Sequence, residues 1–172
     1  MAETFEIPNI TDKNERYKLI FDQAAALIAG ESNQLANMAN LCAVLKYGMN
    51  FFWVGFYLVT DEELVLGPFQ GTVACTRIAK GRGVCGTAWA EEQTILVENV
   101  DHFPGHIACS ALSKSEIVVP LFDINNKIYG VLDVDRQTAI KAVTRNDGHT
   151  YLSFWPNTHH LGDDGYPGRG FA

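Results

Sequence analysis

Residues 115–135 have the sequence SEIVVPLFDINNKIYGVLDVD, which contains two strand-like runs separated by a turn. The runs, residues 115–122 and 127–135, are rich in β-branched and aliphatic side chains. Residues 123–126, Asp-Ile-Asn-Asn, favour a tight turn because asparagine tolerates a positive φ. This stretch therefore predicts an antiparallel β-hairpin.

Three carboxylates fall on one face of this hairpin. With Asn125 and Asn126 at the centre of the turn, Glu116 lies opposite Asp135. Because strand side chains alternate, Asp133 shares the face of Asp135 and Glu116. Like charges opposite each other destabilise a sheet, so this face is either solvated or binds a cation, an ammonium group or a metal ion. One carboxyl of such a cluster could stay protonated near neutral pH and act as an acid.

The residues before the hairpin change from a helical to a strand-like pattern. Apolar residues recur every three or four positions after Asp12 and again after Ser32, which predicts two helices. Residues 51–66 predict a second hairpin, whereas residues 67–84 lack periodicity and indicate mainly loop. Helices followed by antiparallel strands and long loops are typical of an α+β domain.

Length and charge exclude several classes of protein. The chain has 172 residues, the length of one domain, and can bury a core without disulfides. Its net charge of -7 argues against nucleic acid or an anionic membrane as the main partner. There is no apolar run near the roughly 18 residues that span a bilayer, and the acidic N-terminus lacks an apolar segment. We therefore expect a cytoplasmic protein, for which a cationic or zwitterionic small ligand remains open.

One of the four cysteines is predicted to lie in a helix, and the other three lie elsewhere. Cys42 falls in the apolar stripe of the second predicted helix, and we expect it to fill the core. Cys75, Cys85 and Cys109 fall in loops or at the ends of elements. The basic, glycine-rich segment 76–84 lies between the first two of them and could move and stabilise a thiolate.

Three interpretations of these loop cysteines remain open. They could be unremarkable, they could bind zinc together with His102 and His106, or they could carry out dithiol redox chemistry. In the redox case one thiolate attacks, and a second resolves the resulting sulfenic acid into a disulfide. The absence of a CxxC pair disfavours zinc, so redox chemistry is the favoured hypothesis.

Trp53 and Tyr57 are four residues apart in a predicted strand and therefore share a face. Aromatic side chains in a strand usually fill a core. On this face they could equally form the wall of a small pocket that holds a methyl-sulfur group.

Several linked segments together carry a resemblance to a known family. They are FWVGFY at 52–57, GPFQG at 67–71, ACTRI at 74–78, GRGVCGTA at 81–88, FPGHIAC at 103–109, SEIVVPL at 115–121 and GVLDVD at 130–135. In these motifs and their spacing, the chain from about Tyr17 to Asp135 resembles the GAF-domain free methionine-(R)-sulfoxide reductases.

The resemblance implies a fold and a reaction. The fold is a GAF domain over residues 12–135, with a central antiparallel sheet, N-terminal helices on one face and ligand-binding loops on the other. The reaction is the reduction of free L-methionine (R)-S-oxide through a cysteine sulfenic acid and an intramolecular disulfide. Thioredoxin would be the reductant, and the enzyme would act under oxidative stress. We expect no cofactor and no metal.

The resemblance also implies roles for particular residues. Cys109 matches the family's nucleophile, and Cys75 and Cys85 match its resolving cysteines, with the order of the two left open. The matched substrate-binding positions are Trp53, Tyr57, Glu116, Asp133 and Asp135. In this hypothesis the carboxylates hold the substrate ammonium and Trp53 contacts its methyl group, while Glu116 or Asp135 protonates the sulfoxide oxygen.

The chain departs from the family after Asp135. Family members continue with Ser-Pro and an amphipathic helix, whereas here Arg136-Gln137 leads into a Gly- and Asp-rich tail. We expect residues 136–172 to be poorly ordered, and marginal stability or self-association, for example as a homodimer, to follow. The alternative function is a non-catalytic GAF module that senses a small molecule or redox state, because a fold does not imply a function.

Overall fold

Two helices begin the fold in a computed structural model, which describes residue 5 and residues 9–107, 110–138, 142–144 and 150–152. Helix α1 spans Lys13–Ile28 and α2 spans Gln34–Met49. The Asp12 carboxylate caps α1 by accepting two backbone N–H bonds, as the sequence predicts. Asn33 caps α2, one residue after the predicted start.

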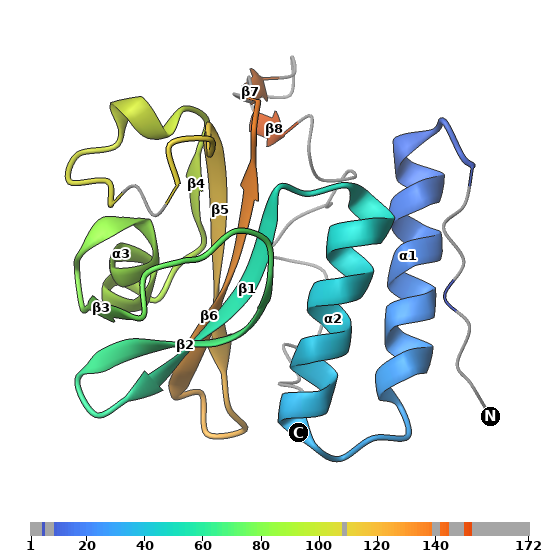
Figure 1. Ribbon diagram of the computed structural model, residues 1–172, viewed down its shortest axis with the longest axis horizontal. Helices are drawn as coiled ribbons and strands as arrows, with labels where there is room; N and C mark the ends of the chain where they lie inside the picture. The colour runs from blue at the N-terminus through green and yellow to red at the C-terminus, as the bar shows by residue number, and fades with distance from the viewer. Residues whose placement is uncertain (1–4, 6–8, 108–109, 139–141, 145–149, 153–172) are drawn as a thin grey trace.

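Six antiparallel strands form one sheet beside these helices, in the order β3-β2-β1-β6-β5-β4. Figure 1 shows α1 and α2 side by side on one side of the sheet, with α3 on the other. This arrangement confirms the α+β sheet with N-terminal helices on one face. The strands and α3 are β1 (Trp53–Thr60), β2 (Glu63–Gln70), β3 (Arg77–Ala79), α3 (Gly83–Glu91), β4 (Ile95–Val97), β5 (Ser115–Phe122) and β6 (Ile128–Arg136).

Alternation along the strands divides the core into two layers. Val54 and Phe56 of β1 pack with Cys42 of α2 in the layer beneath the N-terminal helices. Trp53 and Tyr57 point to the opposite face and pack in the layer that includes α3. Cys42 is fully buried, which confirms its predicted place in the core. The face that carries α3 is the one on which the functional candidates gather.

The predicted pairing of β5 with β6 is confirmed. Glu116 lies opposite Asp135, and Asp133 lies opposite Val118. Asn126 has a φ of 60°, the positive value for which asparagine is suited. The register shifts by one residue next to the turn, between Leu121 and Phe122, and leaves the carboxylate end of the hairpin unchanged.

The segment predicted to be mainly loop contains more structure than its pattern indicates. Strand β2 continues to Gln70, and residues 77–79 form β3, which pairs with the start of β2. Only Ile78 of β3 is buried. An alternation of apolar and polar residues over three positions is too short to predict a strand from sequence.

The segment expected to be a tail is described only in part. Strand β6 ends at Arg136, and β7 (Ala142–Thr144) pairs with β8 (Thr150–Leu152) in a separate two-stranded sheet. Residues 139–141, 145–149 and 153–172 lie outside the described residues. Within the described part of the chain, no helix combines the length and hydrophobicity required to cross a bilayer.

Candidate active site

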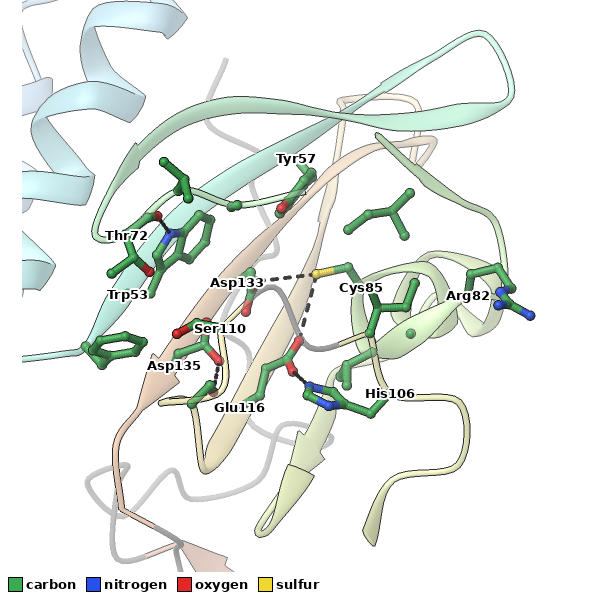
Figure 2. A pocket seen from close by; sticks show the side chains of 18 residues that line it. Trp53, Tyr57, Thr72, Arg82, Cys85, His106, Ser110, Glu116, Asp133 and Asp135 are labelled. Atoms are coloured by element: carbon green, nitrogen blue, oxygen red, sulfur yellow. Dashed lines mark hydrogen bonds and ion pairs between the residues drawn. The ribbon is translucent and has the colours of Figure 1, made fainter. Parts of the chain in front are cut away.

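A pocket lies on the face of the sheet that carries α3. Strands β1, β5 and β6, the start of α3, residues 72–74 and residues 106, 107, 110 and 113 all contribute to its lining. Its empty space, including the part open to solvent, is about 540 Å³. Figure 2 shows the Cys85, Glu116 and Asp133 side chains directed toward one another, with Asp135 and Trp53 beside them.

Three acidic groups and a thiol form the floor of this pocket. Glu116 and Asp133 are each only 7% exposed, and Asp135 is half-buried. The Cys85 thiol, at the start of α3, lies 3.4 Å from Asp133 Oδ2 and 3.9 Å from Glu116 Oε1. The structure thus contradicts a solvated outer face, because Glu116 and Asp133 are buried in the pocket.

Burial and mutual repulsion change how these groups ionise. Burial, with the charges of Asp135 and Glu116, raises the pKa of Asp133 well above its ordinary value. Burial and Glu116 raise the pKa of Asp135 to about 7. Burial and the neighbouring Asp133 likewise raise the pKa of the Cys85 thiol, which favours the neutral thiol over the thiolate. The cluster therefore favours protons or a bound cation.

Two further side chains support the carboxylates. His106 Nε2 lies 3.6 Å from Glu116 Oε2, and this contact raises the pKa of His106. The Ser113 hydroxyl donates a hydrogen bond to Asp135 Oδ1. Sequence reasoning considered His106 only as a zinc ligand and did not single out Ser113. The pairing of β5 with β6 predicts the positions of the carboxylates from sequence. No local sequence pattern predicts the position of the loop that contains His106 and Ser113.

An aromatic wall stands beside the carboxylates. The Trp53 and Tyr57 rings stack with centroids 6.1 Å apart, which confirms that the two residues share a face. Trp53 Nε1 donates to the Thr72 carbonyl at 2.9 Å, and the Tyr57 hydroxyl donates to the Cys75 carbonyl at 3.0 Å. These bonds satisfy the polar atoms of both rings, so the indole and phenol are held as a fixed wall.

The structure brings together six of the eight residues that sequence reasoning selected. All six line the pocket: Trp53, Tyr57, Cys85, Glu116, Asp133 and Asp135. Cys75 follows the lining residue Ala74 and is disulfide-bonded, whereas Cys42 and Cys85 are free thiols. Cys109 lies outside the described residues, between Ile107 and Ser110, which both line the pocket.

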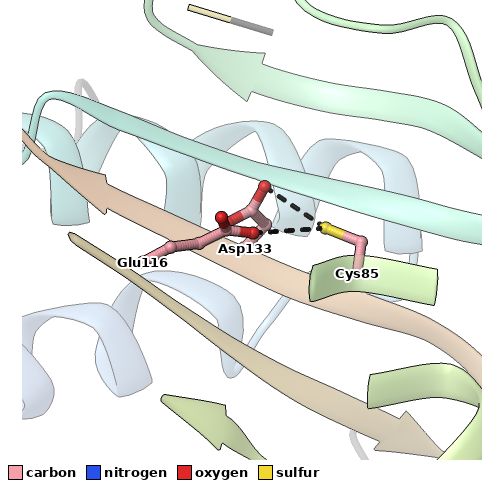
Figure 3. Close-up of side chains that lie close together, drawn as sticks. All are labelled: Cys85, Glu116 and Asp133. Atoms are coloured by element: carbon pink, nitrogen blue, oxygen red, sulfur yellow. Dashed lines mark hydrogen bonds between the residues drawn. The ribbon is translucent and has the colours of Figure 1, made fainter. Parts of the chain in front are cut away.

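The pocket also contains a group of atoms that could hold a metal ion. One ligand atom each from Cys85, Glu116 and Asp133 lies within 4.8 Å of the other two, as Figure 3 shows. This set differs from the zinc ligands considered from sequence. His102 is in the 3₁₀-helix Val100–His102 and is absent from the pocket lining, although His106 lies next to Glu116.

The chemistry available to this site follows from its parts. Buried carboxylates suit a primary ammonium group, and a carboxyl with a pKa near 7 can donate a proton at neutral pH. The rigid indole offers an apolar surface for a methyl or methylthio group. Together they describe a pocket for a small molecule that has an ammonium group and an apolar end, with the Cys85 thiol nearby.

Comparison with known proteins agrees with this description. A family model for the GAF domain matches residues 21–149. GAF domain-containing protein A of Dictyostelium discoideum is 62% identical over 136 residues, which are 78% of this chain and 85% of that protein. The free methionine-R-sulfoxide reductase of Escherichia coli is 52% identical over 125 residues, 72% of this chain and 75% of the relative.

A solved structure extends the similarity to three dimensions. The free methionine-R-sulfoxide reductase of Neisseria meningitidis, determined in complex with its substrate, aligns with a TM-score of 0.77 and 49% identity. The alignment covers 80% of this chain and 83% of that protein. The chain therefore belongs to the GAF-domain family of free methionine-R-sulfoxide reductases.

Proposed function

We propose that the protein reduces free L-methionine (R)-S-oxide to methionine. The observation that carries this proposal is the convergence of three buried carboxylates beside the Trp53 indole in one pocket. A free amino acid presents an ammonium group to the carboxylates, whereas a methionine residue inside a peptide does not. The names of the Escherichia coli and Neisseria meningitidis relatives support the same substrate.

In the proposed complex, Glu116 and Asp133 hold the substrate ammonium. Their burial makes an unpaired negative charge costly, so a bound cation stabilises the site. The Trp53 face contacts the methyl group on sulfur. Ser113 keeps Asp135 in position by donating to Oδ1.

The proposed chemistry begins with the Cys109 thiolate. Its sulfur attacks the sulfoxide sulfur while the Asp135 carboxyl protonates the sulfoxide oxygen. The sulfur of the substrate is reduced by two electrons and methionine leaves, and the Cys109 sulfur is oxidised to a sulfenic acid that carries the oxygen. The lining of the pocket by Ile107 and Ser110 supports a position for Cys109 close to the substrate.

We infer that Cys75, and not Cys85, resolves this sulfenic acid. Attack by a Cys75 thiolate on the Cys109 sulfur forms a disulfide and releases water. Two observations support the choice: Cys75 is disulfide-bonded, and Cys85 is a free thiol held against Asp133 with a raised pKa. A protonated thiol is a poor nucleophile.

The partners of the reaction are also part of the proposal. Thioredoxin is the proposed reductant of the disulfide, in the cytoplasm and under oxidative stress. A homodimer is proposed through the helical layer, where large apolar side chains of α1 and α2 are exposed: Leu19, Phe21, Leu35 and Tyr47. Sedimentation that stays monomeric at all concentrations would contradict the dimer.

The first test measures methionine release from free R- and free S-methionine sulfoxide. With dithiothreitol, we expect turnover of the R epimer only. Without reductant, we expect about one methionine per chain, because the reaction stops at the disulfide. Cys109→Ser should abolish both, and Cys75→Ser should keep the single turnover while losing the disulfide in a mass spectrum.

The control variant is Cys42→Ser, which alters a buried thiol on the opposite side of the sheet. It should keep R-selective turnover if it folds, as judged by circular dichroism. Full turnover by Cys109→Ser would contradict the assigned nucleophile. Binding of the sulfoxide without any turnover would instead support the sensor alternative.

A further inference from the structure

We propose that Cys85, Glu116 and Asp133 form a binding site for a thiophilic divalent cation, Zn²⁺ or Cd²⁺. This goes beyond the proposed reaction, in which Cys85 has no chemical step. The bound cation would occupy the place proposed for the substrate ammonium, so the site would act as an inhibitory one.

The two sulfur–oxygen distances are close to those in a tetrahedral zinc site. With Zn–S near 2.3 Å and Zn–O near 2.0–2.2 Å, sulfur and oxygen ligands lie about 3.5 Å apart. Cys85 Sγ lies 3.4 Å from Asp133 Oδ2 and 3.9 Å from Glu116 Oε1. Three protein ligands and one open position are the usual arrangement of an accessible zinc site.

A second observation points to a missing ligand. Asp133 is more than nine-tenths buried, and its Oδ1 atom has no hydrogen-bond partner among the residues that the structure describes. Asp133 lines the pocket, and Figure 3 shows its carboxylate directed toward Cys85 and Glu116. A buried carboxylate whose hydrogen-bonding capacity is only partly satisfied is costly, and a cation held by Asp133 would reduce that cost.

His106 supplies the outer support that metal ligands commonly have. Oε1 of Glu116 faces Cys85 and Oε2 faces His106. The imidazole can therefore orient the carboxylate without itself binding the metal. Such outer partners contribute about 10- to 100-fold to metal affinity.

The mixed donor set selects the class of cation. One thiolate and two carboxylates suit Zn²⁺ and Cd²⁺, whereas Mg²⁺ and Ca²⁺ prefer sites made of oxygen alone. Binding requires that Cys85 release its thiol proton to solvent and that the carboxyls be ionised, so affinity should rise with pH. No electron transfer is involved.

The test titrates Cd²⁺ into full-length protein that carries Cys75→Ser and Cys109→Ser, which removes the other loop thiols. Ultraviolet charge transfer from thiolate to cadmium reports the bond directly and needs no substrate. We expect one Cd²⁺ per chain, with the intensity of a single thiolate. Adding Cys85→Ser should abolish the signal, and adding Cys42→Ser should leave it unchanged.

Two milder variants keep the test decisive if Cys85→Ser fails to fold. On the same background, His106→Ala and Asp133→Asn should each weaken Cd²⁺ binding by about tenfold or more. The proposal is overturned if folded background protein gives no thiolate signal, if the signal survives Cys85→Ser, or if neither milder variant changes the affinity. Because the probe is the metal alone, these outcomes do not depend on whether the proposed reductase reaction is correct.

Discussion

At the scale of single residues, the pocket wall depends on glycines that let the Trp53 indole lie against the backbone. A Cβ at Gly55 would come within 2.2 Å of the indole, and one at Gly71 within 2.3 Å of its Cδ1 atom. Gly71 also has a φ of 153°, which side-chain-bearing residues rarely adopt. The position of the Trp53 indole in the pocket therefore depends on the absence of a side chain at both glycines.

Gly71→Ala should move the indole and weaken substrate binding. We expect the KM for free methionine (R)-sulfoxide to rise about tenfold, equivalent to about 1.4 kcal/mol, with a stability loss of about 1–3 kcal/mol from overpacking. Steady-state kinetics and urea denaturation measure the two effects. Gly30→Ala, where a Cβ meets nothing within 4 Å, is the control and should leave KM unchanged.

Asp135 should determine the alkaline limit of the reaction. Its pKa is raised from 3.8 to about 7, so the protonated acid that the proposed mechanism requires is lost as the pH increases through about 7. Single-turnover rates should fall above that pH. Asp135→Asn should remove this limb and slow the reaction by about 10²- to 10⁴-fold. An unchanged pH profile in the variant would mean that another group donates the proton.

At the scale of elements, the β5–β6 hairpin determines where the carboxylates lie. Its turn is organised by Asp123, whose Oδ1 accepts backbone N–H bonds from Asn125 at 2.9 Å and Lys127 at 2.8 Å. A slip of one residue in this pairing would turn Glu116 toward the N-terminal helices.

Asp123→Ala should destabilise the hairpin without changing the chemistry. Loss of two bonds to the turn backbone should cost about 0.5–2 kcal/mol in the free energy of unfolding, similar to the loss of a helix cap. Chemical denaturation measures this cost. Turnover at low temperature should remain, because the opposed apolar side chains still specify the register. Loss of the activity in a folded variant would show that the turn alone sets the pairing.

At the scale of the whole molecule, the buried acids link stability to pH. Asp135 and Asp133 bind protons more tightly in the folded chain than in the unfolded one, because burial raises both pKa values. At Asp135 the folded state holds more protons than the unfolded state between pH 3.8 and about 7. The stability that Asp135 contributes is fully present below this window and is lost as the pH rises through it, and Asp133 acts in the same direction.

Thermal unfolding should therefore show a Tm that decreases from mildly acidic to neutral pH. Asp135→Asn, which cannot ionise, should flatten this dependence and raise the Tm near neutral pH. Glu63→Gln, which changes an exposed carboxylate paired with Arg77 outside the pocket, is the matched control. A Tm that rises with pH in the same way for all three proteins would contradict the linkage.

Much of the architecture could be predicted from local patterns. Asp12 marked the first helix, and the alternation in residues 115–135 predicted the pairing that places Glu116 opposite Asp135. Strand β3 was missed because its three residues are ordered by pairing with β2 and not by their own periodicity. The roles assigned to the three loop cysteines remain predictions.

What the sequence by itself determined is the two N-terminal helices, the two hairpins, the register of the β5–β6 hairpin and the shared face of its carboxylates. Those properties follow from alternation and turn chemistry, which act over a few neighbouring residues. Only the tertiary structure decided that this face is buried under α3, that Cys85 lies against Asp133, and that His106 contacts Glu116. These contacts join residues that are distant in sequence. The ionisation of their side chains depends on desolvation, and the side chains lose water only when the chain packs.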